Sequence, residues 1–411
     1  MRELVIDTWR SIVAHRVRFG LTSLGIAWGA FMLTFLSSNL EGFSRHFVAE
    51  FEELGPRIVF MGPGSILKDR VGDRGARVVE LEAEDADRAE QLVSVEEASP
   101  EIGRWALPVR QGRRSKLLRV SGLDAGSDII RNFEMERGRY LSPLDVARGA
   151  RVAVLGAEAS ERLFGRRDPI GGTILVDGLR YRVIGTLVAK GEQLMNSNDR
   201  DDLKVVIPYT TAQRWIARND EVQQLILAPV TKEASWEAIR RVREIVALRE
   251  GYDPSIETAM WAFNIQEPLQ MIEGMFLGIR IFMLGAGLVT LFVGAIGVMN
   301  IMLVVVGERV QEIGVRKAVG ATSREIFVQF LAEATAVSAV SGVTGAAAGI
   351  ALVQGISLLL PEGTAYQSPP VLDPITTGAF TVALIGVGIV AGVVPAIRAA
   401  QTLPAEALRS F

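Results

Sequence analysis

The charged residues best placed to do chemistry lie in one short segment, 307–324, between two long apolar runs. Three of them recur four residues apart: Glu308, Glu312 and Arg316. Side chains at this spacing meet on one side of a helix, and glutamate before arginine is the favoured order for an ion pair. Apolar residues recur at helical spacing on another side: Val310, Ile313 and Ala318. Two interpretations stay open on spacing alone, a solvated connecting loop or a docking element for a cytoplasmic partner.

Two signals set the limits of this expected helix. Gly320 is a suitable stop, because glycine adopts the left-handed conformation without a Cβ penalty. Thr322 and Glu325 enclose a capping box, which predicts that a second helix begins there and continues into apolar sequence. The segment is therefore expected to be a short amphipathic helix, a turn and the start of a membrane helix.

A search for catalytic and cofactor motifs finds none in the 411 residues. The G-x-x-x-x-G-K-[ST] motif of a phosphate-binding loop is absent, as are H-E-x-x-H and G-x-S-x-G. His15 and His46 flank the first apolar run on opposite sides, and the chain has no cysteine, so neither a metal pair nor a thiolate site is expected. Two pairs of adjacent carboxylates are expected to be solvated: Glu52–Glu53 and Asp201–Asp202. We therefore predict no catalytic, cofactor or metal site, and no enzyme activity in this chain.

Four apolar runs must position the charged segment. The mean hydropathy of +0.27 is high for a soluble protein of this length, and the net charge of −3 gives no reason to expect nucleic-acid binding. A bilayer core of about 30 Å needs roughly 20 helical residues. We predict transmembrane helices at the following residues: 19–40, 274–306, 325–360 and 374–397. A cleaved signal peptide is the alternative for the first run, which is however long for one and is not followed by an Ala-x-Ala site.

Polar side chains inside the runs have structural interpretations. Asn300 and Gln354 are expected to make hydrogen bonds between helices. Glu333 falls near one end of the third span, where an acid is costly unless it is paired, so it is expected to pair with a base at that end.

The distribution of lysine and arginine predicts the topology. The N-terminal segment 1–18, the 307–324 segment and the tail 398–411 carry basic residues, whereas 361–373 carries none. Because basic loops stay in the cytoplasm, both termini and 307–324 are predicted to be cytoplasmic. Residues 41–273 and the loop 361–373 then lie outside.

The region 41–273 has the composition of a globular domain of mixed α and β structure. Asp177-Gly178 between apolar runs is a strong two-residue hairpin signal. Strands are expected at 58–61, within 105–122, at 151–155 and at 205–208; helices are expected at 82–93, 158–164 and 236–248. A mobile loop is expected at 65–76. We predict a β-rich insert at about 105–205 within an α/β part.

Several of these stretches resemble one known family, the MacB-type ABC transporter permeases, which include lipoprotein-releasing and FtsX-like permeases. The most specific stretches are the end of the second span with the charged segment, and the C-terminal tail: GAIGVMNIML at 294–303, EIGVRKAVGA at 312–321, PAIRAA at 395–400 and PAEALR at 404–409. Moderately specific ones lie in the external region: 58–64, LFGRRDPIG at 163–171 and 183–185. The resemblance covers nearly the whole chain.

The resemblance implies a fold like that of type VII ABC transporters: four transmembrane helices, with a periplasmic domain of porter-like and Sabre-like parts after the first. It implies that 307–324 is a coupling helix seated on an ATPase subunit. Its contact residues would be Glu308, Arg309, Glu312, Ile313, Arg316, Lys317 and Gly320. ATP and Mg²⁺ would be bound by that partner. A homodimer in the bacterial inner membrane would transmit ATP-driven movement to the periplasm. A periplasmic adaptor protein would be a further partner.

One departure bears on function. Some members carry the ATPase at the N-terminus of the permease, whereas here the first span begins within two dozen residues, so the ATPase is expected to be another polypeptide. That weakens the argument for drug efflux. Export or extraction of a substrate is the leading hypothesis. The alternatives are FtsX-like signalling or lipoprotein sorting without transmembrane transport, and a membrane-anchored binding protein without an ATPase.

Overall fold

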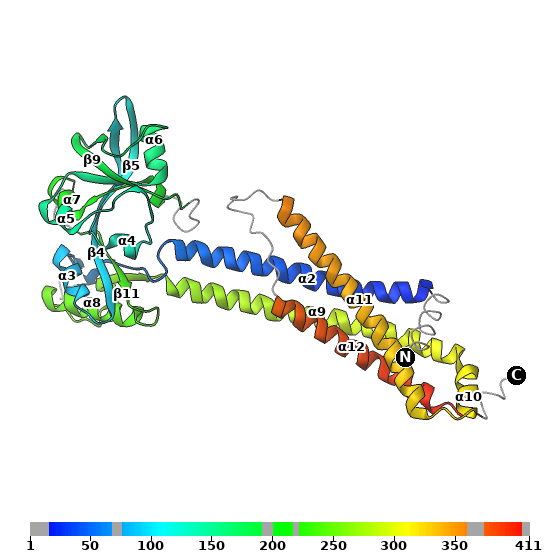
Figure 1. The fold of residues 1–411 in the computed structure, drawn as a ribbon. Coiled ribbons are helices and arrows are strands. Elements are labelled where there is room, and N and C mark those ends of the chain that lie inside the picture. The colour runs from blue at the N-terminus through cyan, green and yellow to red at the C-terminus, as the bar shows by residue number, and fades with distance from the viewer. Residues whose placement is uncertain (1–15, 68–75, 191–199, 217–221, 360–373, 405–411) are drawn as a thin grey trace. The chain divides into compact units, whose positions relative to one another are not determined.

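The computed structural model describes residues 16–67, 76–190, 200–216, 222–359 and 374–404 (Figure 1). The chain divides into two compact units. Unit 1 comprises Met1–His46 with Glu273–Phe411, and unit 2 comprises Phe47–Ile272. Two long helices continue from one unit into the other: α2 (Arg16–Glu53) and α9 (Gln266–Glu308).

Unit 1 consists of helices. Besides its parts of α2 and α9 it contains α10 (Val310–Ala318), α11 (Ser323–Leu359) and α12 (Pro374–Gln401). By length and composition, three helices among the described residues could cross a membrane: Ser23–Ala49, Gln266–Glu308 and Ser323–Ile356. The side chains of α12 are described only in part, and its apolar stretch Gly386–Gln401 is shorter. The fourth predicted span therefore stays a prediction.

Glycines let these helices approach closely. A Cβ added to Gly294 of α9 would lie 2.9 Å from Cγ1 of Ile26 on α2. On α12, a Cβ added to Gly388 would lie 2.6 Å from Cβ of Ser338 on α11. Small residues at such crossings are typical of helix packing in lipid, where close backbone approach supplies the attraction.

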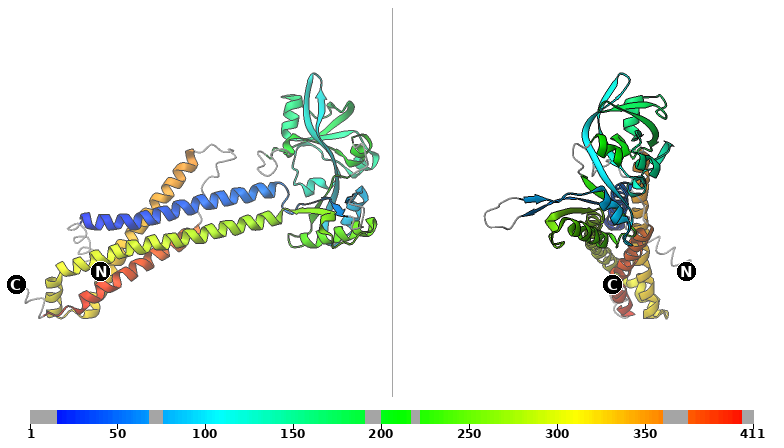
Figure 2. Two further views of the ribbon diagram at one scale, coloured as in Figure 1. Left: turned by 180° about the vertical axis from the view of Figure 1, so that it is seen from behind. Right: turned by 90° about the vertical axis from the view of Figure 1, so that its left-hand side faces the viewer.

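Unit 2 is built on one ten-stranded sheet in the order β12-β1-β11-β4-β5-β10-β7-β9-β6, with β8 paired to β4 and β9. Figure 2 shows the ribbon from two further directions. Its strands are β1 (Val59–Pro63), β4 (Val95–Gln111), β5 (Arg114–Leu123), β6 (Met135–Gly138), β7 (Val152–Leu155), β8 (Thr173–Val176), β9 (Leu179–Leu187), β10 (Lys204–Pro208), β11 (Gln224–Pro229) and β12 (Met260–Asn264). Its helices are α3 (Ala83–Glu90), α4 (Ser127–Ile130), α5 (Pro143–Arg148), α6 (Ala157–Phe164), α7 (Tyr209–Trp215) and α8 (Ser235–Glu250), with 3-10 turns η2 (Asp201–Leu203) and η3 (Glu257–Ala259).

Both faces of this sheet are buried. In β11, Leu225 and Leu227 belong to one apolar core, whereas Ile226 and Ala228 between them belong to another. Alternate residues of a strand point to opposite faces, so each core lies on its own side of the sheet. The first core includes residues of α3, α6, α7 and α8, and the second includes residues of α4.

Several sequence predictions in unit 2 are confirmed. β8 and β9 pair as an antiparallel hairpin around Asp177 and Gly178, and both of these residues have positive φ angles, 46° and 84°. The expected strand at 58–61 extends further, to Pro63. The mobile loop expected at 65–76 is wrong in part, because Ser65–Leu67 and Ala76–Val78 pair as β2 and β3; residues 68–75 lie outside the described residues. The predicted start of the insert, residue 105, falls inside β4.

The expectation that Asp201 and Asp202 are solvated is wrong. They are only 2% and 4% exposed. Asp201 pairs with Lys204 at 2.8 Å, Lys190 at 3.1 Å and Arg131 at 3.4 Å. Burial alone would raise the pKa of Asp201, but the three cations outweigh it and hold that pKa below its usual range.

The ion pairs of this cluster continue to a second buried carboxylate. Arg131 also bonds Glu101 of β4 at 2.6 Å, and Glu101 pairs with Arg119 of β5 at 3.0 Å. Arg131 and Asp201 are 70 residues apart in sequence. A pattern of adjacent carboxylates cannot reveal partners that only the folded chain brings together.

Candidate coupling site

The predicted charged helix is interrupted at its start. α9 ends at Glu308 and α10 begins at Val310, with Arg309 between them at φ −102° and ψ 10°. The expectation that Glu308 shares one helix with Glu312 and Arg316 is therefore wrong for Glu308, which is the last residue of α9. The break redirects the chain, so that α10 can pack against other helices of unit 1.

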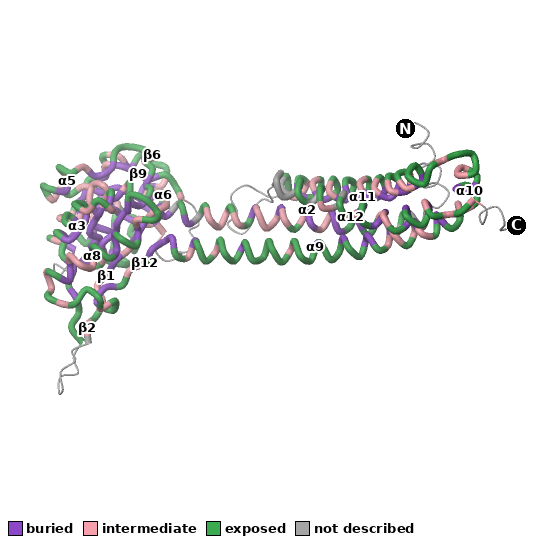
Figure 3. The backbone as a smooth tube through the Cα atoms, turned by 90° about the horizontal axis from the view of Figure 1, so that it is seen from below, coloured by how far each residue is buried: buried purple, intermediate pink, exposed green. Residues whose placement is uncertain are grey.

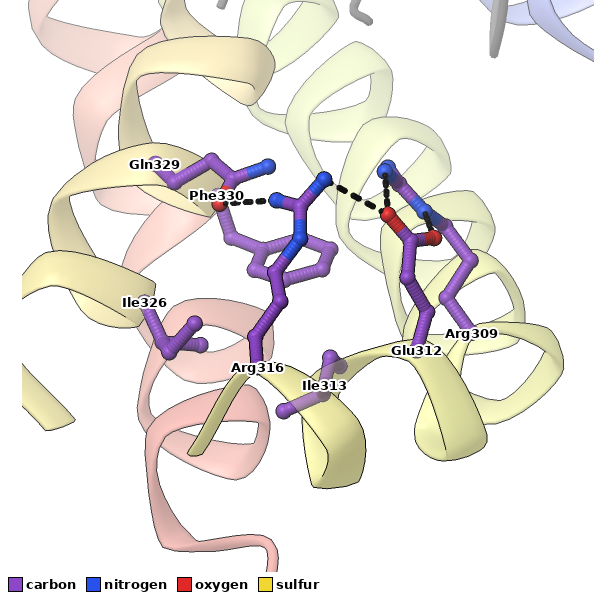
Figure 4. Close-up of a pocket in the computed structure, with 7 residues that line it drawn as sticks. All are labelled: Arg309, Glu312, Ile313, Arg316, Ile326, Gln329 and Phe330. Carbon is purple, nitrogen blue, oxygen red and sulfur yellow. Dashed lines mark hydrogen bonds and ion pairs between the residues drawn. The ribbon is translucent and has the colours of Figure 1, made fainter. Parts of the chain in front are cut away.

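A series of hydrogen bonds and ion pairs between side chains runs from this break to α11 (Figure 4). Arg309 bonds both carboxylate oxygens of Glu312, at 2.8 and 3.1 Å. Glu312 pairs with Arg316 at 2.8 Å, and Arg316 donates to Gln329 of α11 at 2.9 Å. The hydrogen bond from Arg309 lowers the pKa of Glu312, so this carboxylate is ionised at neutral pH.

Arg309 also reaches a buried acid. Its Nη1 lies 3.4 Å from Oε2 of Glu333, whose side chain is 2% exposed, and its guanidinium lies 5.6 Å from the ring of Phe330. The prediction that Glu333 pairs with a base is confirmed. An isolated charge at this position would be costly, so the pair holds the end of α9 against α11.

Apolar packing holds α10 from the same side. Ile313 is 2% exposed and lies with Ile326 and Phe330 in the core of unit 1. Ile313 was expected among the contact residues for a partner. The structure places it inside, where it positions α10 on α11.

Lys317 ties α10 to a third helix. Its ammonium donates to the carbonyl oxygen of Ala400 in α12, at 2.6 Å, and to that of Thr402 just beyond, at 3.0 Å. Carbonyl groups at a helix C-terminus have no hydrogen-bond donor within the helix, so the ammonium group supplies one. Its positive charge also interacts favourably with the negative end of the helix dipole.

The exposed surface of α10 is mixed: Gln311 and Glu312 are exposed, together with apolar side chains towards the C-terminal end. Val315 is 50% exposed and Val319 is 85% exposed, and Ala318 between them is also exposed. Val319 is the residue that directly follows α10, so the apolar part of the exposed surface lies at the C-terminal end of the helix. The sequence analysis did not single out the two valines, although their spacing of four residues was a readable signal.

The predicted end of the helix and the start of the next are confirmed. Gly320 has φ +110°, a conformation that favours glycine. Thr322 and Glu325 form the capping box: the Glu325 amide donates to Thr322 Oγ1 at 3.2 Å, and the Thr322 amide donates to Glu325 Oε2 at 2.8 Å.

The polar side chains of this site are engaged in ion pairs and hydrogen bonds with one another. Among the described residues, no group of three or more His, Cys, Asp or Glu side chains could hold a metal ion. The cavity among Arg309, Ile313, Arg316 and Phe330 is filled by their own side chains. The arrangement fixes one helix on three others and leaves its other side exposed.

Two family models match the chain over most of its length. Residues 19–245 match the MacB-like periplasmic core domain, and residues 268–404, which include α10, match the FtsX-like permease C-terminal domain. The chain belongs to this family of ABC transporter permeases. The resemblance found in the sequence is thereby confirmed.

Curated relatives are export proteins of pseudomonads. The pyoverdine export ATP-binding/permease protein PvdT of Pseudomonas entomophila is 33% identical over 413 residues, which cover 100% of this chain and 60% of that protein. A probable export ATP-binding/permease protein of Pseudomonas fluorescens is 30% identical over 408 residues and is covered to the same 60%. The chain thus spans less than two thirds of the length of these relatives.

A solved structure is also similar. The periplasmic region of MacB from Actinobacillus actinomycetemcomitans matches with a TM-score of 0.43 and 19% identity, over 54% of this chain and 95% of that one.

Proposed function

We propose that this permease receives movement from a cytoplasmic ATPase through α10 and transmits it along α2 and α9 to unit 2, which drives export or extraction of a substrate. The observation that carries the proposal is the construction of α10. Three sets of contacts hold it to α9, α11 and α12, while Val315 on it and Val319 directly after it are exposed. A helix so fixed moves its neighbours when a partner moves it.

The long helices supply the connection to the outside. α2 has 38 residues and α9 has 43. At 1.5 Å per residue these helices are about 57 and 65 Å long, roughly twice the 30 Å of a bilayer core. Each is therefore longer than a bilayer core requires, and each contributes residues to both units.

An ion pair joins the two helices where their uncharged runs end. Glu41 of α2 bonds Arg280 of α9 at 2.7 Å. Phe43 and Phe276 pack edge to face beside it, with ring centroids 5.8 Å apart. These contacts make the two helices move together at the expected outer surface of the membrane.

The remaining assignments follow from this arrangement. We propose four spans in the bacterial inner membrane, cytoplasmic termini, and a homodimer with two ATPase subunits that bind ATP and Mg²⁺. A periplasmic adaptor is a further partner to test. The names of the relatives favour export over FtsX-like signalling or lipoprotein sorting.

Co-purification tests the docking of the ATPase. The protein would be solubilised in detergent and the co-purifying material assayed for ATP hydrolysis, with Val319→Asp as the test variant. Burying a carboxylate in an apolar contact is costly, so this variant should lose the ATPase. Val93→Asp is the control, since Val93 is 98% exposed in unit 2, and it should retain the ATPase. Equal ATPase content in the two variants would contradict docking through α10.

A further inference from the structure

Unit 2 contains a cavity of about 210 Å³ whose lining is partly apolar and partly cationic. It lies beside β5, where the neighbouring strand ends. β10 begins at Lys204, opposite Arg119, so among the described residues no strand continues on that side of β5 along 114–118. Residues of α6 and of the turn η2 complete the lining. Figure 3 shows the exposed residues of unit 2 in green, with α6 labelled.

A β-bulge brings an aromatic ring to this cavity. The pairing of β4 with β5 shifts between Arg104 and Leu107, so that Trp105 and Ala106 together oppose the single residue Arg119. Ala106 has φ 54°, a conformation that favours glycine. Bulges redirect side chains and are frequent beside active sites, and such unfavourable backbone angles are often retained at ligand-binding positions. The bulge is therefore a reason to examine the cavity as a binding site.

The apolar part of the lining is open to a ligand. Trp105 is 54% exposed and Leu117 is 67% exposed, and Leu203 lines the same cavity. The guanidinium of Arg119 lies 4.0 Å from the centroid of the Trp105 ring. Because the indole is still more than half exposed, it can also pack against a planar ring from outside, as aromatic side chains do with one another.

The cationic part of the lining can hold an anion. It contains three arginines, Arg119, Arg162 and Arg200, and no acidic residue among the described residues that line the cavity. The side chain of Arg162 is 44% exposed and bonds Glu158, four residues earlier in α6, through one nitrogen. A guanidinium has five N–H donors in a planar fork, so Arg162 retains donors for a second carboxylate.

We propose that this cavity binds an aromatic carboxylate, with its ring on Trp105 and its carboxylate on Arg162. The size agrees with this class, since an apolar cavity of about 150 Å³ accommodates benzene and the larger volume here leaves space for a carboxylate. A planar carboxylate also suits the guanidinium fork, which bonds both oxygens at once. This inference goes beyond the proposed function, because binding to unit 2 does not require the ATPase.

Calorimetric titration of the full chain in detergent with benzoate tests the proposal, and benzamide is the matched uncharged ligand. Loss of a charge-assisted hydrogen bond should make benzamide bind at least about 10-fold more weakly. This comparison uses the native protein, so it does not depend on the folding of a variant. No binding of benzoate, or equal affinity for the two ligands, would overturn the proposal.

Two pairs of variants locate the site. Trp105→Ala should weaken benzoate binding about 10-fold, whereas Trp236→Ala should not, although Trp236 on α8 is equally exposed at 56%. Arg162→Gln should weaken binding at least about 10-fold. Its control is Arg241→Gln, because Arg241 also pairs with a glutamate four residues earlier and its side chain is 49% exposed.

The outcomes of these titrations separate this inference from the proposed function. Unchanged benzoate binding in Trp105→Ala and Arg162→Gln, or an equal loss in the two controls, would refute the site even where the ATPase co-purifies. Specific loss in Trp105→Ala and Arg162→Gln from a preparation without the ATPase would support the site while contradicting the proposed function.

Discussion

One methyl group added to Gly388 of α12 tests whether tight packing of α11 and α12 supports the coupling site. In Gly388→Ala the new Cβ would lie 2.6 Å from Cβ of Ser338, whereas ordinary contacts begin at 3.4 Å. The helices would have to separate by about 0.8 Å, because neither atom is the end of a flexible side chain. The same pair of helices holds α10, through Gln329 on α11 and Ala400 on α12.

Gly386→Ala is a matched control on the same helix. A Cβ at Gly386 would meet nothing within 4 Å, so this variant gains only the helix propensity of alanine, about 1 kcal/mol. Gly388→Ala gains the same propensity but incurs overpacking of about 1–3 kcal/mol. The difference corresponds to an apparent melting temperature roughly 2–12 °C lower for Gly388→Ala than for Gly386→Ala.

Thermal unfolding in detergent, followed by the loss of the monodisperse peak in size-exclusion chromatography, measures this difference. Gly388→Ala should also retain less co-purifying ATPase, because separation of α11 from α12 disturbs the contacts that hold α10 to these two helices. A melting temperature of Gly388→Ala equal to or above that of Gly386→Ala would refute the packing argument.

Three further predictions concern the buried charges. Glu101→Gln removes the nearer of the two buried carboxylates that pair with Arg131 and should destabilise unit 2 by about 3–5 kcal/mol, measured by chemical denaturation; an unchanged midpoint would show that the pair is dispensable. The folded-state pKa values of Glu101 and Asp201 lie below their unfolded values, because their cations outweigh the effect of burial. The stabilisation that these two carboxylates provide is therefore complete above pH about 4 and is lost as the pH falls towards their folded-state pKa values. Glu101→Gln should accordingly make acid unfolding less steep. An acid-unfolding profile identical to that of the native protein would contradict this. Glu333→Gln removes the buried partner of Arg309 and should reduce ATPase-coupled activity while membrane insertion is retained; loss of insertion instead would indicate a purely structural role.

Local signals in the sequence predicted local structure well. The hairpin at Asp177-Gly178 and the capping box from Thr322 to Glu325 each depend on a few adjacent residues, and both are confirmed. The partner of Glu333 could be predicted because an acid at that depth requires a base, and Arg309 provides it.

Features that depend on tertiary contacts could not be predicted. The side chain of Lys317 bonds a carbonyl at the end of α12, 83 residues later in the chain. The position of Lys317 within α10 could not reveal this partner. Arg309, at the break between α9 and α10, contacts Glu333, which lies 24 residues away. The exposed valines Val315 and Val319, which the spacing of the charged residues did not reveal, adjoin the partly exposed Glu312 and Arg316.

The central claim is that movement of the ATPase passes through α10 to the outer part of α9. Spin labels on a cysteine at Met275, an exposed residue of α9 beyond its uncharged run, would report the distance between the two copies in the complex with the ATPase. We predict that ATP shifts this distance distribution in the otherwise native protein and that Val319→Asp abolishes the shift. An ATP-dependent shift that persists in Val319→Asp, or no shift in the native complex, would contradict the account.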